Sequence, residues 1–163
     1  MTAGSHRLAQ FLAFSSDVTA FTEFELRGTG QAQAYLSATE NVVGEALVGK
    51  LLDGYMGVKT MAEGDPPTLV NLLRAEIFSD EKLGPVARNI VKLWYVGIWY
   101  ELPRAWTEAF GALEEDFTFM VSPTAYTEGL LWPAIGASPP GAKAPGYGSW
   151  VAPPRIPAFE TAE

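Results

Sequence analysis

The stretch SDEKLGPVARNIVKLWYVG, residues 79–97, decides the fold of this 163-residue chain. Ser79 and Asp80 are residue types that cap the start of a helix, and Gly97 is placed to end one. Between them the apolar residues recur at three- and four-residue steps, the spacing of one helical face. The stretch therefore predicts an amphipathic helix that buries Val86, Ile90, Leu93 and Trp94.

Aromatic residues crowd the end of this helix and the residues after it. Residues 93–106, LWYVGIWYELPRAW, hold three tryptophans and two tyrosines. Trp94 is expected on the buried face, but its neighbour Tyr95 points about 100° away on a helix. The same holds for the pair at 99 and 100, so another surface has to cover the outer rings. Because tryptophan and tyrosine are enriched at interface hot spots, we predict a partner interface of Trp94, Tyr95, Trp99, Tyr100, Trp106, Trp132, Tyr147 and Trp150.

Helical patterns dominate the first 131 residues. The expected helices follow three- and four-residue apolar spacing and span residues 5–15, 31–54, 65–77, 79–97 and 122–131. Gly54 is placed to stop the long second helix, Asp65 is a cap candidate, and Ser122-Pro123 opens the last helix. Residues 118–123 fit a short strand or an extended connector. These patterns predict an all-α fold, a small irregular bundle of about five helices over residues 1–131.

Residues 132–163 differ in character and are predicted to form an extended arm rich in proline and glycine. They hold seven of the twelve prolines. Proline fixes φ and has no amide hydrogen to donate, so turns and extended chain are expected here without regular elements. Solvated linkers rarely carry Trp132, Tyr147, Trp150 and Phe159. The arm is therefore expected to lie against protein, either its own domain or another chain.

Charge and composition exclude several classes of protein. Eleven Lys and Arg against nineteen Asp and Glu give a formal net charge of −8, which repels a nucleic-acid backbone. The absence of cysteine excludes disulfides, thiolate nucleophiles and iron–sulfur ligation. Apolar runs fall far short of the roughly 20 residues that a membrane helix requires. The chain is expected not to cross a bilayer, and its first residues do not resemble a signal peptide.

No motif in the sequence carries convincing chemistry. GEALVGK, residues 44–50, lacks the hydroxyl residue of a phosphate-binding loop and lies within a helical pattern. His6 is the single histidine, and the run 114–116 of adjacent acids is expected to be solvated surface. Glu101 and Glu108 have two interpretations. They could form part of a two-carboxylate pair of a hydrolase, or they could be charges at the rim of an interface. We predict no catalytic, cofactor-binding or metal-binding residue in this chain.

Two blocks of the sequence resemble a known family. The first is GPVARNIVKLWYVGIWY, residues 84–100, with Trp94, Tyr95 and Gly97; the second is SPTAYTEGLLWPAIGASPPGAKAPGYGSW, residues 122–150. Together they are similar to the small subunit of bacterial membrane-bound FAD-dependent sorbitol dehydrogenases and of related fructose and glucose dehydrogenase complexes. Family members often begin with a twin-arginine leader, which this sequence does not have.

The resemblance implies a non-catalytic small subunit that stabilises a large flavoprotein and helps its maturation or export. The implied partners are a large FAD-containing subunit of the glucose-methanol-choline type and a multi-haem cytochrome c subunit. FAD and haem c would thus belong to the partners, and the complex would lie at the periplasmic face of the bacterial inner membrane, with this chain touching the membrane only indirectly.

Two other functions remain open from the sequence. One is a small independent enzyme that uses carboxylates in a helical cleft, and the other is a sugar-binding module with an aromatic cage. Purification of the chain alone separates the enzyme from the subunit, because a stable monomer with turnover favours the enzyme and aggregation relieved by a partner favours the subunit. Titration of the isolated chain with sorbitol, followed by tryptophan fluorescence, tests the sugar-binding module.

Overall fold

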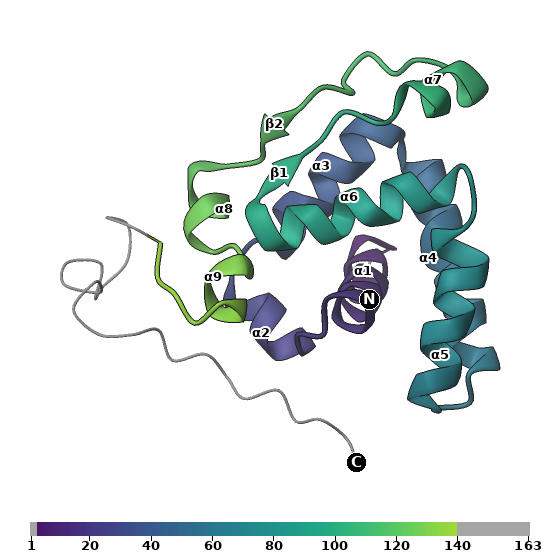
Figure 1. Cartoon of the computed structure of the whole chain (residues 1–163), viewed down its shortest axis with the longest axis horizontal. Helices are drawn as coiled ribbons and strands as arrows, with labels where there is room; N and C mark the ends of the chain where they lie inside the picture. Colours follow the sequence, from purple (N-terminus) through teal and green to yellow (C-terminus); the bar gives the residue numbers. More distant parts are fainter. Residues whose placement is uncertain (1–2, 140–163) are drawn as a thin grey trace.

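Helices make up most of the computed structural model, which describes residues 3–139 (Figure 1). The elements in chain order are α1 (Ala3–Thr19), α2 (Glu23–Gly28), α3 (Ala32–Val43), α4 (Glu45–Met61), α5 (Pro66–Leu72), the π-helical η1 (Leu73–Phe78), α6 (Leu83–Val96), β1 (Ile98–Trp99), α7 (Arg104–Phe110), β2 (Phe119–Met120), α8 (Pro123–Thr127) and α9 (Leu131–Ala134). The two short strands pair antiparallel, with Ile98 opposite Met120. The predicted all-α bundle is confirmed, although the described residues form more helices than expected and most of these are shorter.

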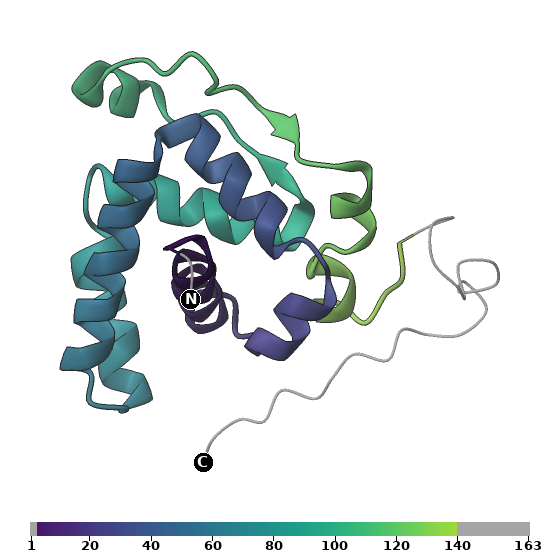
Figure 2. The same ribbon diagram turned by 180° about the vertical axis from the view of Figure 1, so that it is seen from behind.

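Helix α6 lies at the centre of this bundle, in contact with α1, α3, α4 and η1 (Figures 1 and 2). Its predicted apolar face is buried throughout. Trp94 is the largest residue on that face, and its ring packs against Phe11 of α1 and Tyr35 of α3, with centroid distances of 6.2 and 5.0 Å. Rings at such separations contribute packing energy beyond the area they bury. One side chain of α6 thus joins two other helices.

The carboxyl end of α6 is sealed by a later part of the chain. Gly97 ends the helix in the left-handed conformation, with φ 71°, as predicted. The carbonyl oxygen of Trp94 accepts from the amide of Leu130 at 2.9 Å, and that of Gly97 accepts from Val121 at 3.0 Å. A Cβ at position 97 would lie 2.6 Å from Cβ of Ala125. The helix-end carbonyls, which lack partners within their own helix, therefore hold α8 and the residue before α9 in place.

The long helix predicted to end at Gly54 is in fact two helices. Gly44, with φ 85° and ψ 146°, separates α3 from α4, whereas Gly54 lies inside α4. Glycine reaches this positive φ without the steric penalty of a Cβ. Across the break, Arg7 of α1 pairs with Glu40 at 3.1 Å and with Glu45 at 3.2 Å. Helix α1 therefore stabilises the turn between α3 and α4 through these ion pairs. The periodicity of residues 31–54 does not reveal this contact.

Side-chain caps fix the start of several helices. Asp65 accepts from the amide of Thr68 at 3.0 Å, as its predicted role requires. Asp80 accepts from the amide of Leu83 at 2.6 Å ahead of α6, while the hydroxyl of Ser79 donates instead to a carbonyl of η1. The helix predicted over 5–15 is longer, since α1 ends at Thr19. Local capping chemistry was thus readable from the sequence at most of these positions.

The last helical segment begins as predicted but is divided. The hydroxyl of Ser122 accepts from the amide of Ala125 at 3.1 Å and caps α8. The single helix predicted through residue 131 is wrong, because α8 ends at Thr127 and a separate α9 follows. Helical structure then continues to Ala134, so the prediction of no regular element from residue 132 is also wrong at its start. The division leaves the amide of Leu130 free to bond to α6.

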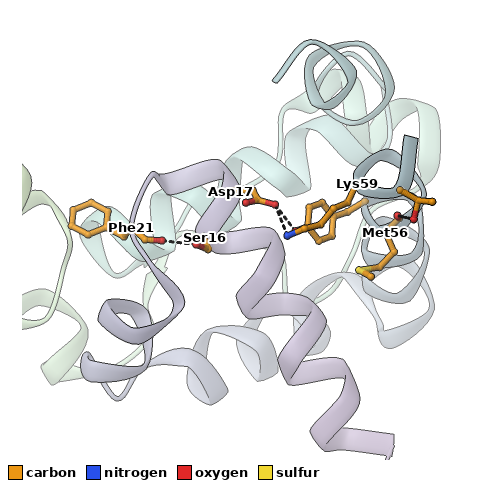
Figure 3. Close-up of polar contacts among 7 residues, drawn as sticks. Ser16, Asp17, Phe21, Met56 and Lys59 are labelled. Carbon is orange, nitrogen blue, oxygen red and sulfur yellow. Dashed lines mark hydrogen bonds and ion pairs between the residues drawn. The ribbon is translucent and has the colours of Figure 1, made fainter. Parts of the chain in front are cut away.

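A polar cluster joins α1 to α4 (Figure 3). Asp17 accepts from the hydroxyl of Tyr55 at 2.6 Å and from Nζ of Lys59 at 3.0 Å. Nζ of Lys59 also donates to the Tyr55 hydroxyl at 2.9 Å. Burial raises the pKa of Tyr55, and the hydrogen bond to Asp17 raises it further. The cluster therefore satisfies a phenol hydroxyl whose ring is fully buried.

We predict that Gly97→Ala lowers the free energy of unfolding by about 2–4 kcal/mol, through the left-handed backbone and the clash with Ala125. Urea denaturation followed by far-ultraviolet circular dichroism measures this change. Gly57→Ala is the matched control, since nothing lies within 4 Å of a Cβ built at Gly57. Alanine there should leave stability unchanged or raise it by up to about 1 kcal/mol. Equal effects of the two substitutions would contradict the sealed helix end.

We also predict that stability falls as the pH rises above 10. Burial raises the pKa of Tyr35 and of Tyr55 above the ordinary value of about 10. The folded chain therefore keeps protons that the unfolded chain releases, so their contribution is complete below pH 10 and is lost above it. Unfolding free energies measured between pH 8 and about 11 test this. The decline should be shallower in Tyr55→Phe, and an identical decline would contradict the assignment.

Candidate partner interface

The three tryptophans of residues 93–106 lie inside the chain rather than on its surface. Trp94 is 1% exposed, Trp99 is 0% exposed and Trp106 is 4% exposed. The indole N–H of Trp106 donates to the carbonyl oxygen of Lys82, at 2.9 Å, just before α6. The prediction that these three rings offer surface to a partner is therefore corrected. They are core residues of this fold.

Trp99 is buried because Asp116 supplies the hydrogen-bond acceptor that its indole N–H needs. Oδ1 of Asp116 accepts from Nε1 of Trp99 at 2.9 Å, and Oδ2 accepts from the amide of Leu102 at 3.0 Å. The acidic run was expected to be solvated surface. Glu114 and Glu115 are indeed exposed, whereas Asp116 is half-buried and points inward. Adjacent acids give no sequence signal for this difference.

The two tyrosines of the same stretch divide between core and surface. Tyr95 is half-buried, and its hydroxyl donates to the carbonyl oxygen of Thr19 at 2.9 Å. Its ring also meets Phe21 edge to face, at 6.2 Å between centroids. Tyr100 is 37% exposed, with Nζ of Lys92 4.9 Å from its ring centroid. Tyr100 thus remains available to a partner, and Tyr95 only in part.

Trp132 is half-buried at the start of α9 and is held rigidly. Its indole N–H donates to the carbonyl oxygen of Tyr126 at 2.7 Å. The two rings pack at 5.3 Å between centroids and 77° between planes. The remaining members of the predicted interface, Tyr147 and Trp150, lie outside the described residues.

Trp132 belongs to a surface that sequence reasoning did not single out. Helices α2, α8 and α9 lie together at one end of the molecule in both views (Figures 1 and 2). Three exposed apolar side chains come from this region: Phe24 is 86% exposed, Tyr126 is 39% exposed and Ile135 is 45% exposed. Together with Trp132 we call these residues the neck surface. The name reflects the position of α9 as the last helix of the described residues. Large exposed apolar side chains at one end of a molecule are candidates for an interaction site.

The helix that carries Phe24 is capped at its start. Glu25 accepts from the amide of Thr22 at 2.8 Å, and its own amide donates to the Thr22 hydroxyl at 3.3 Å. This reciprocal capping box satisfies two helix-end amides at once. These hydrogen bonds from Thr22 lower the pKa of Glu25, so the carboxylate is ionised at neutral pH. The motif Thr-Glu-Phe-Glu was the available sequence signal for a rigid helix bearing an exposed phenylalanine.

Beside the neck surface lies a pocket of about 340 Å³, formed by α2 and by residues 127–139. We call it the neck pocket. Phe21 and Trp132 supply its aromatic lining, and Glu25 and Glu128 supply its carboxylates. The pocket thus combines aromatic side chains with negative charge.

A larger and more open groove of about 740 Å³ lies along α4 and η1. Charges of both signs line it, including Lys50, Asp53 and Glu76. Arg7 also lines it, but that guanidinium is already bound to Glu40 and Glu45. The mixed charges of this groove do not favour a partner of either sign.

Of the two acids considered for a carboxylate pair, Glu101 is exposed and Glu108 is engaged in an ion pair. Glu108 pairs with Arg104 of its own helix, at 2.8 Å in an exposed position. The hydroxyl of Tyr55 donates to Asp17, and its raised pKa makes it a weak proton donor at neutral pH. Within residues 3–139, acidic and histidine side chains form no group of three that could hold a metal ion.

None of the helices in the described part of the chain has the length and apolar character needed to cross a bilayer. Comparison of the chain with models of protein families, with curated proteins and with solved structures gave no match.

We predict that Trp99→Ala lowers the free energy of unfolding by about 3–5 kcal/mol, because it leaves a cavity in the core. Tyr100→Ala, at the neighbouring exposed position, should cost about 1 kcal/mol or less. Urea denaturation of both variants gives the comparison. If Tyr100→Ala were the more damaging change, the assignment of core and surface in this stretch would be wrong.

Proposed function

We propose that this chain is the non-catalytic small subunit of a membrane-bound FAD-dependent sugar or polyol dehydrogenase complex. The proposal starts from the resemblance of residues 84–100 and 122–150 to such subunits. In the complex, FAD in the large subunit supplies the redox chemistry, and a multi-haem cytochrome c subunit carries electrons away. This chain binds the large subunit, stabilises it and supports its maturation or export at the periplasmic face of the inner membrane.

The observation that carries this proposal is the exposure of the neck surface. Phe24 leaves 86% of its surface in water although it lies on a capped helix. Burial of apolar area contributes roughly 25 cal/mol per Å², so a partner that covers this ring gains free energy that the isolated chain does not. Because the capping box already orders α2, binding pays little further conformational entropy there.

The position of the neck surface would allow one partner protein to contact both this surface and the C-terminal arm. Trp132 and Ile135 lie in and just after α9, and residues 140–163 follow directly. Trp132 and Ile135 thus belong to the first residues of the proline-rich arm predicted over 132–163, which also holds the predicted interface residues Tyr147 and Trp150. A partner bound at the neck surface can engage the arm without a long intervening linker. This continuity favours a binding subunit over a free-standing enzyme.

We predict that the large flavoprotein, expressed without this chain, is less soluble, holds less FAD and is less stable than the assembled complex. Co-expression and co-purification of both chains measure all three properties. A large subunit that is equally soluble, FAD-loaded and stable alone would contradict the proposed function.

The neck surface is tested by Phe24→Ala combined with Ile135→Ala. We expect this double variant to lower recovery of the large subunit by at least about tenfold, as expected when hot-spot residues are removed. Met61→Ala is the matched control, because Met61 is 58% exposed but lies at the end of α4. Circular dichroism of the purified variants confirms that each is folded. Equal recovery with the double variant and with the control would exclude this surface.

A further inference from the structure

The neck pocket lies where the chain leaves the last described helix. Gly136 follows α9 in the left-handed conformation, with φ 66°. Its amide donates to the carbonyl oxygen of Pro133 at 3.1 Å, and the amide of Ala137 donates to that of Trp132 at 2.9 Å. These two hydrogen bonds form a Schellman motif, which turns the chain at the end of a helix. The backbone itself therefore sets the direction in which the chain continues past α9.

The first residues of the predicted arm already lie against the body of the chain. Trp132 and Pro133 line the pocket, and so do residues 137–139 after the turn. Pro139, the last described residue, is buried. Residue 140 therefore follows directly from the lining of the pocket.

The pocket offers a ligand aromatic surface, but most of the hydrogen-bond donors around it are used within the chain. The hydroxyl of Thr29 donates to the carbonyl oxygen of Leu26 at 2.7 Å, and that of Thr127 donates to the carbonyl oxygen of Thr124 at 3.0 Å. The indole N–H of Trp132 is bound to a carbonyl oxygen of α8. A ligand that needs donors, such as a phosphate, is therefore disfavoured. The volume of about 340 Å³ is at the lower end of the range for ligand pockets, which suits one bulky apolar side chain.

The segment that follows the pocket has a charge and a side chain that match it. Residues 140–159 contain Lys143 and Arg155 and no acid, whereas the chain as a whole has a net charge of −8. Electrostatic attraction therefore favours contact between this segment and the rest of the chain. Among its aromatic residues, Trp150 brings the largest apolar surface, and an indole needs no hydrogen-bond donor from the pocket.

The chain between Pro139 and Trp150 is long enough to return to the pocket. Extended chain of the polyproline type rises about 3.1 Å per residue, so this stretch spans up to about 34 Å. Pro140 and Gly141 are the residue types favoured at the two central positions of a type II turn, which reverses the direction of the chain. Both the length and the turn residues thus permit Trp150 to reach the pocket from which the segment starts.

We propose that Trp150 occupies the neck pocket, against the rings of Phe21 and Trp132, so that the arm folds back on its own chain. This inference goes beyond the proposed function, because it concerns the chain before any partner binds. Trp150 is then covered by its own chain, while Tyr147 is held close to the neck surface. A partner meets a surface that is already ordered, which lowers the entropy lost on binding.

The chain has no cysteine, so Ala152→Cys provides a single attachment point for a nitroxide spin label two residues beyond Trp150. The full-length chain, labelled with ¹⁵N, is followed by NMR at the indole N–H signals, each assigned by its loss when that tryptophan is replaced by phenylalanine. We expect the nitroxide to broaden the signal of Trp132, whose indole is fixed by the carbonyl oxygen of Tyr126. The signal of Trp106 should stay sharp, because its helix α7 lies apart from α9 in both views (Figures 1 and 2).

Two pairs of variants distinguish docking from proximity along the chain. In the spin-labelled chain, Trp150→Ala should lower the paramagnetic relaxation rate at Trp132 at least about threefold, because an undocked arm spreads over the dimensions of a flexible chain. Tyr147→Ala should leave this rate unchanged. Ala137→Phe fills an exposed position of the pocket lining and should act like Trp150→Ala. Ala134→Phe is its matched control, at an exposed position of α9 outside the described lining. Circular dichroism confirms that each variant is folded.

A relaxation rate that Trp150→Ala leaves unchanged, or that Tyr147→Ala lowers equally, would overturn the inference. Broadening of Trp132 in a mixture of unlabelled ¹⁵N chains with spin-labelled chains that lack ¹⁵N would show docking on a second copy, and would overturn it too. The result is separable from the proposed function. An undocked arm with intact recovery of the large subunit contradicts only this inference, whereas a docked arm without any such recovery contradicts only the proposed function.

Discussion

The closure of the carboxyl end of α6 is the constraint on which the rest of the structure depends. A helix leaves its last carbonyls without partners, and in α6 these groups lie beside a buried tryptophan where water has little access. The amides of Val121 and Leu130 bond to two of them. An unpaired buried carbonyl costs free energy, so the later segment is fixed on α6 rather than loosely attached. Gly97 makes this approach possible, because any side chain there would collide with α8.

This closure also determines where the neck surface lies. The residues that seal α6 belong to the segment that leads into α9, so α9 and its Trp132 lie next to α2. Phe24 projects from α2 on a helix with its own cap. Backbone hydrogen bonds to the end of α6 thus position the segment that carries Tyr126 and Trp132, while Phe24 belongs to α2, which is distant in sequence. A rigid apolar surface assembled in this way suits recognition of another protein.

Polar partners accompany the burial of two of the three tryptophans in residues 93–106. Trp99 and Trp106 are core residues because Asp116 and the carbonyl oxygen of Lys82 accept from their indole N–H groups. Tyr100 follows Trp99 directly and faces solvent instead. A concentration of aromatic residues in the sequence indicated large buried area, but not whether the burial is internal or against a partner. For Trp99 and Trp106 the acceptors lie elsewhere in the chain, whereas the buried indole N–H of Trp94 has no hydrogen-bond partner in the described residues.

The sequence by itself determined the helical class, the buried face of α6, the caps at Asp65 and Ser122, and the role of Asp80 as an acceptor for the first amide of α6, because these depend on residues within one or two turns. Only the tertiary structure decided that Gly44 breaks a helix while Gly54 does not, and that Asp116 faces inward. It also placed Glu25 and Trp132 beside the same pocket. The physical reason is the distance along the chain over which each interaction acts. Capping and periodicity act between near neighbours, whereas burial and charge pairing depend on which distant segments the fold brings together.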